Sequence, residues 1–157
     1  MDSCAITDHG SLFGAVESYN AACKGGIKPI IGCEVYVTPN GRGSRTAREE
    51  EEPYHLILLA TDKAGYRNLS KLSSIGYTEG FYYKPRVDLE VLAEHSEGLI
   101  AMSACLAGEI PRKIQNRDMR GAEESAMKYA DIFGKESFFL ELQSNRIPEQ
   151  AMVNSAL

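Results

Sequence analysis

The stretch "AITDHGSLFG", Ala5 to Gly14, joins a short apolar segment to a polar turn and then to the start of a helix. Asp8 and His9 stand side by side where the apolar segment ends, and Gly10 follows them. One interpretation is a tight turn in which Asp8 forms an Asx-turn or caps the helix. The other is a metal site at the end of a strand, because imidazole and carboxylate groups are common metal ligands. The rest of the chain has to distinguish the two.

Outside this stretch, apolar strand-like segments alternate with helical segments and are joined by short connections. Strands are expected at 4–7, 27–38, 54–61, 98–104 and 137–143, and the second of these is expected to break or bend around Pro29 and Gly32. Helices are expected at 12–24, 89–96, 109–115, 120–133 and after 148, and another is expected to run from its cap Asp62 to about 74. This alternation is typical of βα units around a parallel sheet, which gather catalytic groups at the C-terminal ends of their strands. We therefore expect a single α/β domain.

Composition limits the classes of function. The chain has 157 residues, enough for one sizeable core, and its apolar runs are too short to cross a bilayer. No signal peptide is visible, so we expect a cytoplasmic protein with no membrane partner. The net charge of -5 argues against nucleic-acid binding by phosphate neutralisation alone, but not against a metal site that acts on phosphates. The four cysteines form no CxxC pair and are expected to be thiols.

A polar, glycine-bearing segment covers residues 39–53 and ends in the acidic run Glu49 to Glu52. We interpret the run as part of a solvated loop, since nothing in the sequence fixes these carboxylates in place. Residues 41–52 are expected to be the least ordered internal segment, because they carry too little apolar surface to offset the entropy of ordering.

Four side chains of metal-binding type lie in or next to the expected strands: His9, Glu34, His55 and Cys105. They could converge in a parallel sheet, although no local spacing enforces it, and His55 stands at the wrong end of its strand for such a site. Each also has a structural interpretation. His9 could bond within its turn, His55 could be a core histidine, and Cys105 could be a buried thiol. Glu34 is harder to place, because a carboxylate in an apolar strand is costly without a partner or a cation.

Long strings of the sequence resemble one known family. The segments, in chain order, are "AITDHGSLFGAVESY", "GIKPIIGCEVYVTP", "YHLILLATDKAGYRNLSKLSSIGYTEGFYYKPRVD", "EGLIAMSACLAGEIPR" and "FFLELQSNRIPEQ". Together they resemble the PHP (polymerase and histidinol phosphatase) domain of the bacterial replicative DNA polymerase III alpha subunit. The resemblance implies a TIM-like β/α barrel with a cluster of divalent metal ions, zinc, manganese or magnesium, in its mouth. By this resemblance His9, Glu34, His55 and Cys105 match metal ligands, while Asp8 supports the site without binding metal directly.

Parts of the family pattern have no counterpart in these residues. The family also carries a His-x-His strand and a further Asp upstream, and a strand with Asp-x-His downstream. We therefore expect 1–157 to be a partial PHP domain, truncated at both ends, whose barrel lacks the first and last family strands. The polymerase domain is not in this chain, and the metal cluster would be incomplete. The fragment alone is expected to be inactive.

The resemblance implies metal-dependent phosphodiester hydrolysis, as a 3'-5' proofreading exonuclease module of a DNA-directed DNA polymerase. DNA and other replicase subunits would then be the partners. Two alternatives stay open: a non-catalytic scaffold that stabilises the polymerase or docks a partner subunit, and a small-molecule phosphoesterase of the same superfamily. In the loop 80–88, the side chains that could contact a DNA strand are Tyr82, Tyr83, Lys84 and Arg86. Alternatively, these aromatic rings pack the loop onto the barrel.

Overall fold

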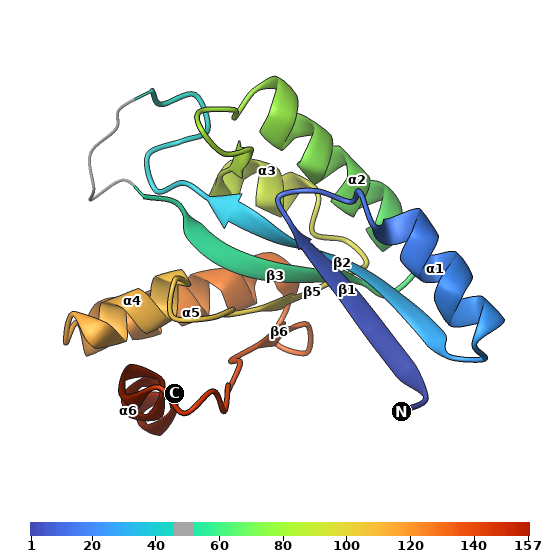
Figure 1. The fold of residues 1–157 in the computed structure, drawn as a ribbon. Helices are drawn as coiled ribbons and strands as arrows, with labels where there is room; N and C mark the ends of the chain where they lie inside the picture. The colour runs from blue at the N-terminus through green and yellow to red at the C-terminus, as the bar shows by residue number, and fades with distance from the viewer. Residues whose placement is uncertain (46–51) are drawn as a thin grey trace.

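The computed structural model describes residues 1–45 and 52–157 (Figure 1). In these residues six strands form one mixed sheet, and six helices accompany it. The strands are β1 (Ser3–His9), β2 (Lys28–Val37), β3 (Tyr54–Ala60), β4 (Arg86–Val87), β5 (Leu99–Met102) and β6 (Phe138–Phe139). The helices are α1 (Ala15–Lys24), α2 (Lys63–Thr78), α3 (Leu89–Glu94), α4 (Glu109–Gln115), α5 (Met119–Phe133) and α6 (Pro148–Ala156).

The strand order is β1-β2-β3-β5-β6, and β4 pairs with β2 beside this path. Figure 1 shows α1 and α2 along one side of the sheet, with α4, α5 and α6 gathered near its other end. None of the helices in 1–45 and 52–157 has the length and hydropathy needed to span a bilayer.

The expectation of a parallel sheet is wrong for β3. β1, β4 and β2 are parallel to one another, and β5 is parallel to β6, but β3 runs antiparallel to both β2 and β5. A parallel pair needs a crossover connection, usually a helix, whereas the described part of the β2–β3 connection contains none. Because β3 is reversed, its first residues lie at the edge where β2 ends, and His55 pairs with Tyr36.

Of the break or bend predicted around Pro29 and Gly32, the break is wrong, because β2 is one continuous strand. Pro29 pairs with Cys4 of β1 but lies before Gly32, where the pairing of β2 with β3 begins, so its missing N–H can lie on the unpaired side of the strand. Gly32 is required by crowding, because a Cβ atom there would lie 2.6 Å from the carbonyl oxygen of Leu58. β6 is also much shorter than the strand expected at 137–143, and α2 extends beyond the expected end at 74.

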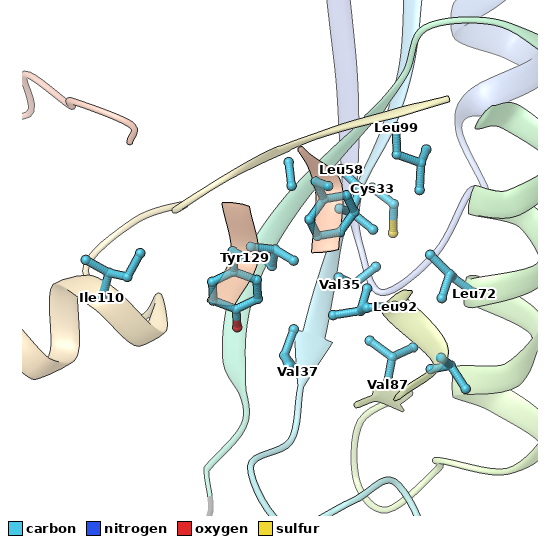
Figure 2. Packing of buried hydrophobic residues seen from close by; sticks show 14 of the residues in the cluster. Cys33, Val35, Val37, Leu58, Leu72, Val87, Leu92, Leu99, Ile110 and Tyr129 are labelled. Atoms are coloured by element: carbon cyan, nitrogen blue, oxygen red, sulfur yellow. The ribbon is translucent and has the colours of Figure 1, made fainter. Parts of the chain in front are cut away.

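One face of the sheet packs on helices and forms the core. Alternate residues of β2 point to this face, and Cys33, Val35 and Val37 are at most 3% exposed. They lie in one cluster with Leu58 of β3 and with side chains of α2, α3 and α5, including Leu72, Leu92 and Tyr129 (Figure 2). The residues between them in sequence, Glu34 and Tyr36, therefore point to the opposite face of the sheet.

The described part of the loop after β2 is anchored by ion pairs. The guanidinium of Arg42 lies 2.9 Å from a carboxylate oxygen of Glu79, 3.1 Å from one of Asp88 and 2.9 Å from one of Glu90. The backbone N–H of Arg42 also donates to Asp88. The rest of the segment expected to be least ordered, 46–51, lies outside the described residues, and so does most of the acidic run 49–52.

Replacing Gly65 with alanine is expected to destabilise the fold by about 1–3 kcal/mol, as overpacking commonly does. A Cβ atom on Gly65 would lie 1.9 Å from the carbonyl oxygen of Gly98, where α2 crosses the turn before β5. A loss of stability would be informative, because alanine forms helices better than glycine and would otherwise stabilise α2. Urea unfolding measures the change. Gly43→Ala is the control, since no described heavy atom lies within 4 Å of a Cβ placed there. Equal stability of the two variants would contradict the expected clash.

Candidate metal centre

Strands β1, β2 and β3 and the turn after β5 bring the four predicted ligands together. His9, the last residue of β1, pairs in register with Glu34 of β2. His55 lies at the start of the reversed strand β3 and pairs with Tyr36, on the same face as Glu34. Cys105 follows β5 in a tight turn. The reversal of β3 therefore removes the difficulty that His55 stands at the start of its strand.

Glu34, His55 and Cys105 each offer one ligand atom, and these three atoms lie within 4.8 Å of one another. Oε1 of Glu34 is 2.7 Å from Nδ1 of His55, and Sγ of Cys105 is 3.6 Å from the same nitrogen. Tetrahedral ligands about 2.0–2.3 Å from an ion lie roughly 3.3–3.8 Å from one another. The separation between sulfur and nitrogen matches this range, and the separation between oxygen and nitrogen is shorter.

The carboxylate of Glu34 is buried, and one of its oxygens lacks a hydrogen bond. Glu34 is 8% exposed, and its Oε1 has no hydrogen-bond partner among the described residues. Its close approach to Nδ1 of His55 lacks the alignment of a hydrogen bond, so we regard the pair as electrostatic. An unpartnered buried carboxylate oxygen is costly. A cation between Glu34, His55 and Cys105 would remove this cost, so the residues present fit a divalent metal ion of the kind bound by His, Cys and carboxylate.

The electrostatics at these three side chains favour a positive charge. The neighbouring Cys105 and Glu34 raise the pKa of His55 to about 9, against the effect of burial. His55 in turn lowers the pKa of Cys105, although burial opposes the shift. Burial also opposes ionisation of Glu34, but His55, His9 and Lys84 outweigh it and lower the pKa of Glu34. A metal ion would supply this positive charge in place of the proton on His55.

His9 lies next to this group. Its Nε2 is 3.5 Å from Oε1 of Glu34, slightly shorter than the roughly 4–8 Å expected for two ligands of one metal cluster. The rings of His9 and His55 are 6.1 Å apart between centroids. The side chain of His9 is 67% exposed, so it faces solvent at the entrance to the buried carboxylate. His9 and Glu34 therefore lie on the same face of the sheet.

Asp8 has a different environment. Its register partner is the buried Cys33, so Asp8 lies on the face opposite His9 and Glu34. Its Oδ2 accepts a hydrogen bond of 2.8 Å from the backbone N–H of Gly14, the residue that precedes α1. Asp8 thus bonds to the residue before α1, whereas α1 itself has no side-chain hydrogen bond at its N-cap. A supporting role of Asp8 at the metal site stays a prediction.

The PHP domain family matches residues 1–145 of the 157 in the chain. The chain belongs to the PHP domain family. The DNA polymerase III subunit alpha of Treponema pallidum is 48% identical over 154 residues, which is 98% of this PHP chain and 13% of the relative. The protein of the same name from Borreliella burgdorferi is 46% identical over 161 residues, 100% of the chain and 14% of the relative. That from Thermus aquaticus is 48% identical over 98% of the chain and 13% of the relative. This PHP chain thus spans about an eighth of the length of these relatives.

The predicted DNA contacts in the 80–88 loop of this PHP domain differ in burial, and Arg86 is the buried one. Arg86 is 4% exposed, and its guanidinium donates to the carbonyl oxygens of Gly80, Arg42 and Ser44. It holds the loop and the segment after β2 together, and Arg86 as a DNA contact stays a prediction. Burial in a strand that pairs with β2 was not visible from the aromatic and basic composition of the loop.

The other residues of this loop differ in exposure. Tyr83 is 82% exposed, and the rings of Tyr82 and Tyr83 contact each other with centroids 4.6 Å apart. Nζ of Lys84 lies 4.8 Å above the ring of Tyr36, and its side chain is 40% exposed. Tyr82, Tyr83 and Lys84 as DNA contacts stay a prediction.

Two features of the PHP site were missed from the sequence. The ring of Tyr36 lies 5.3 Å from that of His55, and the two-residue spacing from Glu34 could have placed it on the same face. The Cys105 turn is set by Ala104, which has a φ of 61°, and by Gly108, whose N–H donates to the carbonyl of Cys105. A Cβ atom on Gly108 would lie 2.1 Å from the carbonyl oxygen of Ser103, so the turn requires glycine there.

Proposed function

We propose that this PHP domain is a metal-dependent phosphoesterase module of a DNA polymerase III alpha subunit, and that it acts there as a 3'-5' proofreading exonuclease. The convergence of Glu34, His55 and Cys105, with a buried carboxylate oxygen that lacks a hydrogen-bond partner, carries the proposal. The identities of 46% to 48% with polymerase III alpha subunits of several bacteria support the choice of parent protein.

In the proposed mechanism Glu34, His55, Cys105 and His9 would hold a divalent metal ion, which is zinc, manganese or magnesium. Such an ion would lower the pKa of a water molecule and polarise a phosphate. Glu34 and Cys105 would supply the negative charge of the site, and His55 would bind the ion as a neutral imidazole. Tyr36 packs against His55 and restricts the orientation of its ring. His9 is the exposed member, so a diester would approach from its side.

We further propose that 1–157 is part of a TIM-like barrel that is completed by other strands. β1 and β6 end the strand path within the described residues, and the alpha-subunit relatives are much longer than this chain. DNA and other replicase subunits are the proposed partners, and the cytoplasm is the proposed location.

A second candidate is a non-catalytic scaffold. Large apolar side chains are exposed on α1, where Val16 is 68% and Tyr19 51% exposed, and they border a cavity of about 460 Å³ against β2 and α2. Such a surface suits packing against further protein. Metal content separates the two candidates, because a scaffold does not require stoichiometric metal at Glu34, His55 and Cys105.

The 157-residue chain by itself is expected to lack robust nuclease activity with manganese or zinc, because it supplies only part of the ligand set that the family pattern implies. A version extended at both ends is expected to cleave a 3'-labelled DNA strand in a metal-dependent way. Glu34→Gln in the extended version should abolish this cleavage. Equal activity in the short and extended versions would mean that the four residues suffice. No cleavage by the extended version would overturn the proposed activity.

A further inference from the structure

Three aromatic rings form a row at the surface of the molecule, and we call them the aromatic row. Phe13, Tyr77 and Phe81 are 84%, 41% and 50% exposed. The ring centroids of Phe13 and Tyr77 are 6.3 Å apart. Those of Tyr77 and Phe81 are 6.0 Å apart, and their planes are 19° from parallel. Contacting rings that remain exposed present a flat apolar surface, which is typical of a binding site rather than of scattered surface residues.

The aromatic row adjoins the candidate metal centre. Phe13 lies in the loop that leads from His9 to α1, and Tyr77 lies at the end of α2. Gly76, the residue before Tyr77, lies against Pro85, and a Cβ atom built on Gly10 would meet both Pro85 and the ring of Tyr36. The ring of Tyr36 contacts that of His55 with centroids 5.3 Å apart. The aromatic row therefore lies beside the residues that pack around Tyr36 and His55.

A cation stands beside these residues. Nζ of Lys84 lies 4.8 Å above the centre of the ring of Tyr36. The side chain of Lys84 is 40% exposed, and Glu52 lies 3.9 Å from its Nζ. A ligand with alternating flat rings and negative charges would match the aromatic row together with Lys84.

We propose that the aromatic row stacks on the bases of single-stranded DNA and leads the end of the strand to the metal centre, an inference that rests on the proposed phosphoesterase function. Bases of any sequence stack on aromatic side chains, and each stack changes affinity roughly 5- to 150-fold. Duplex DNA hides its base faces, so the row selects a single strand. With a net charge of -5, the chain has to bind such a strand through stacking more than through phosphates.

The test measures binding of a fluorescently labelled oligothymidine strand to the full 157-residue chain in the presence of EDTA, by anisotropy. Tyr77→Ala and Phe81→Ala are each expected to weaken binding at least about fivefold, and Phe81→Trp is expected to retain it. Tyr66→Ala is the matched control, because Tyr66 is 42% exposed on the same helix as Tyr77 but near its other end. Phe13→Ala, at an 84% exposed loop position, removes a ring of the row with little loss of buried contact.

Salt dependence gives a second readout. One lysine beside the row predicts a slope of log affinity against log salt near -0.7, whereas a slope steeper than about -3 would indicate phosphate-dominated binding and overturn the proposal. No binding by the unmodified chain, or equal affinity of the Tyr77→Ala and Tyr66→Ala variants, would also overturn it and would leave the row as a protein contact.

Because EDTA removes metal, the binding test is independent of catalysis. Hydrolysis of bis(p-nitrophenyl) phosphate, a diester without bases, by the extended version tests the phosphoesterase separately. Strand binding without hydrolysis would support DNA binding by the aromatic row and overturn the proposed phosphoesterase function. Hydrolysis without strand binding would overturn only DNA binding by the aromatic row.

Discussion

Replacing Cys105 with serine is expected to weaken divalent metal binding by more than about 100-fold. Loss of a residue that merely orients a metal ligand commonly costs 10–100-fold in affinity, and loss of a ligand should cost more. Cys105 would be the soft ligand of the proposed metal centre, and its sulfur lies 3.6 Å from Nδ1 of His55. Titration with cobalt(II) measures both the affinity and the absorption band that a thiolate ligand produces.

The chain offers a matched control for this experiment. Cys23 is an exposed free thiol on α1, away from the sheet edge that carries the site. Cys23→Ser is expected to leave both the cobalt affinity and the thiolate band unchanged, whereas Cys105→Ser removes the band. An unchanged band in Cys105→Ser would exclude this thiol as a ligand and with it the proposed metal centre.

Replacing Glu109 with alanine is expected to destabilise the protein by about 3–5 kcal/mol, the cost of breaking a buried charged pair from one side. Glu109 is 8% exposed at the start of α4. Its carboxylate accepts hydrogen bonds from Lys113 at 2.8 Å, from Ser125 at 2.7 Å and from Tyr129 at 2.9 Å. The variant would leave the hydroxyls of Ser125 and Tyr129 buried without this acceptor. Denaturant unfolding measures the loss.

The same carboxylate predicts a pH dependence. Burial opposes ionisation of Glu109, but Lys113, Ser125 and Tyr129 outweigh it and lower the pKa below the ordinary 4.5. A lowered pKa means that the stabilisation is present above pH 4.5 and is lost as the pH falls through the lower folded value. The difference in stability between the unmodified chain and Glu109→Gln should therefore shrink below that pH.

Glu124→Ala serves as the control for both measurements. Its carboxylate forms an ion pair of 2.9 Å with Arg120 on α5, one helical turn away, but the two side chains are 62% and 89% exposed. Exposed ion pairs contribute little to the free energy of unfolding, so this variant should change neither the stability nor its pH dependence by much. A loss in Glu124→Ala as large as that in Glu109→Ala would show that burial of the Glu109 network is not the cause.

Much of this fold could be predicted from local patterns. The bounds of α4 were predicted as observed, and Asp62 caps α2 as expected, with its side chain accepting from the N–H of Gly65. The direction of β3 could not be predicted, because an apolar run such as 54–60 suits a buried strand of either direction. Direction depends on which neighbours the strand pairs with, and those pairings join residues distant in sequence.

The candidate site was predictable in its residue types and less so in its geometry. Glu34 was singled out because an acid in an apolar strand needs a partner, and His55 indeed lies beside it. The burial of Arg86 could not be predicted, because a basic residue in an aromatic loop is typical of an exposed ligand contact. The Ala104 turn gave no signal, since its positive φ is imposed by the surrounding tertiary structure.

The reversed strand β3 also bears on the order in which the site assembles during folding. Glu34 and His55 belong to strands that are consecutive along the chain, so closing the loop between them costs relatively little entropy. Cys105 lies 50 residues beyond His55 and reaches it only when β5 has joined β3. An early β2–β3 pair would already present a carboxylate and an imidazole to a metal ion. Metal added during refolding should therefore speed a step that precedes docking of the Cys105 turn.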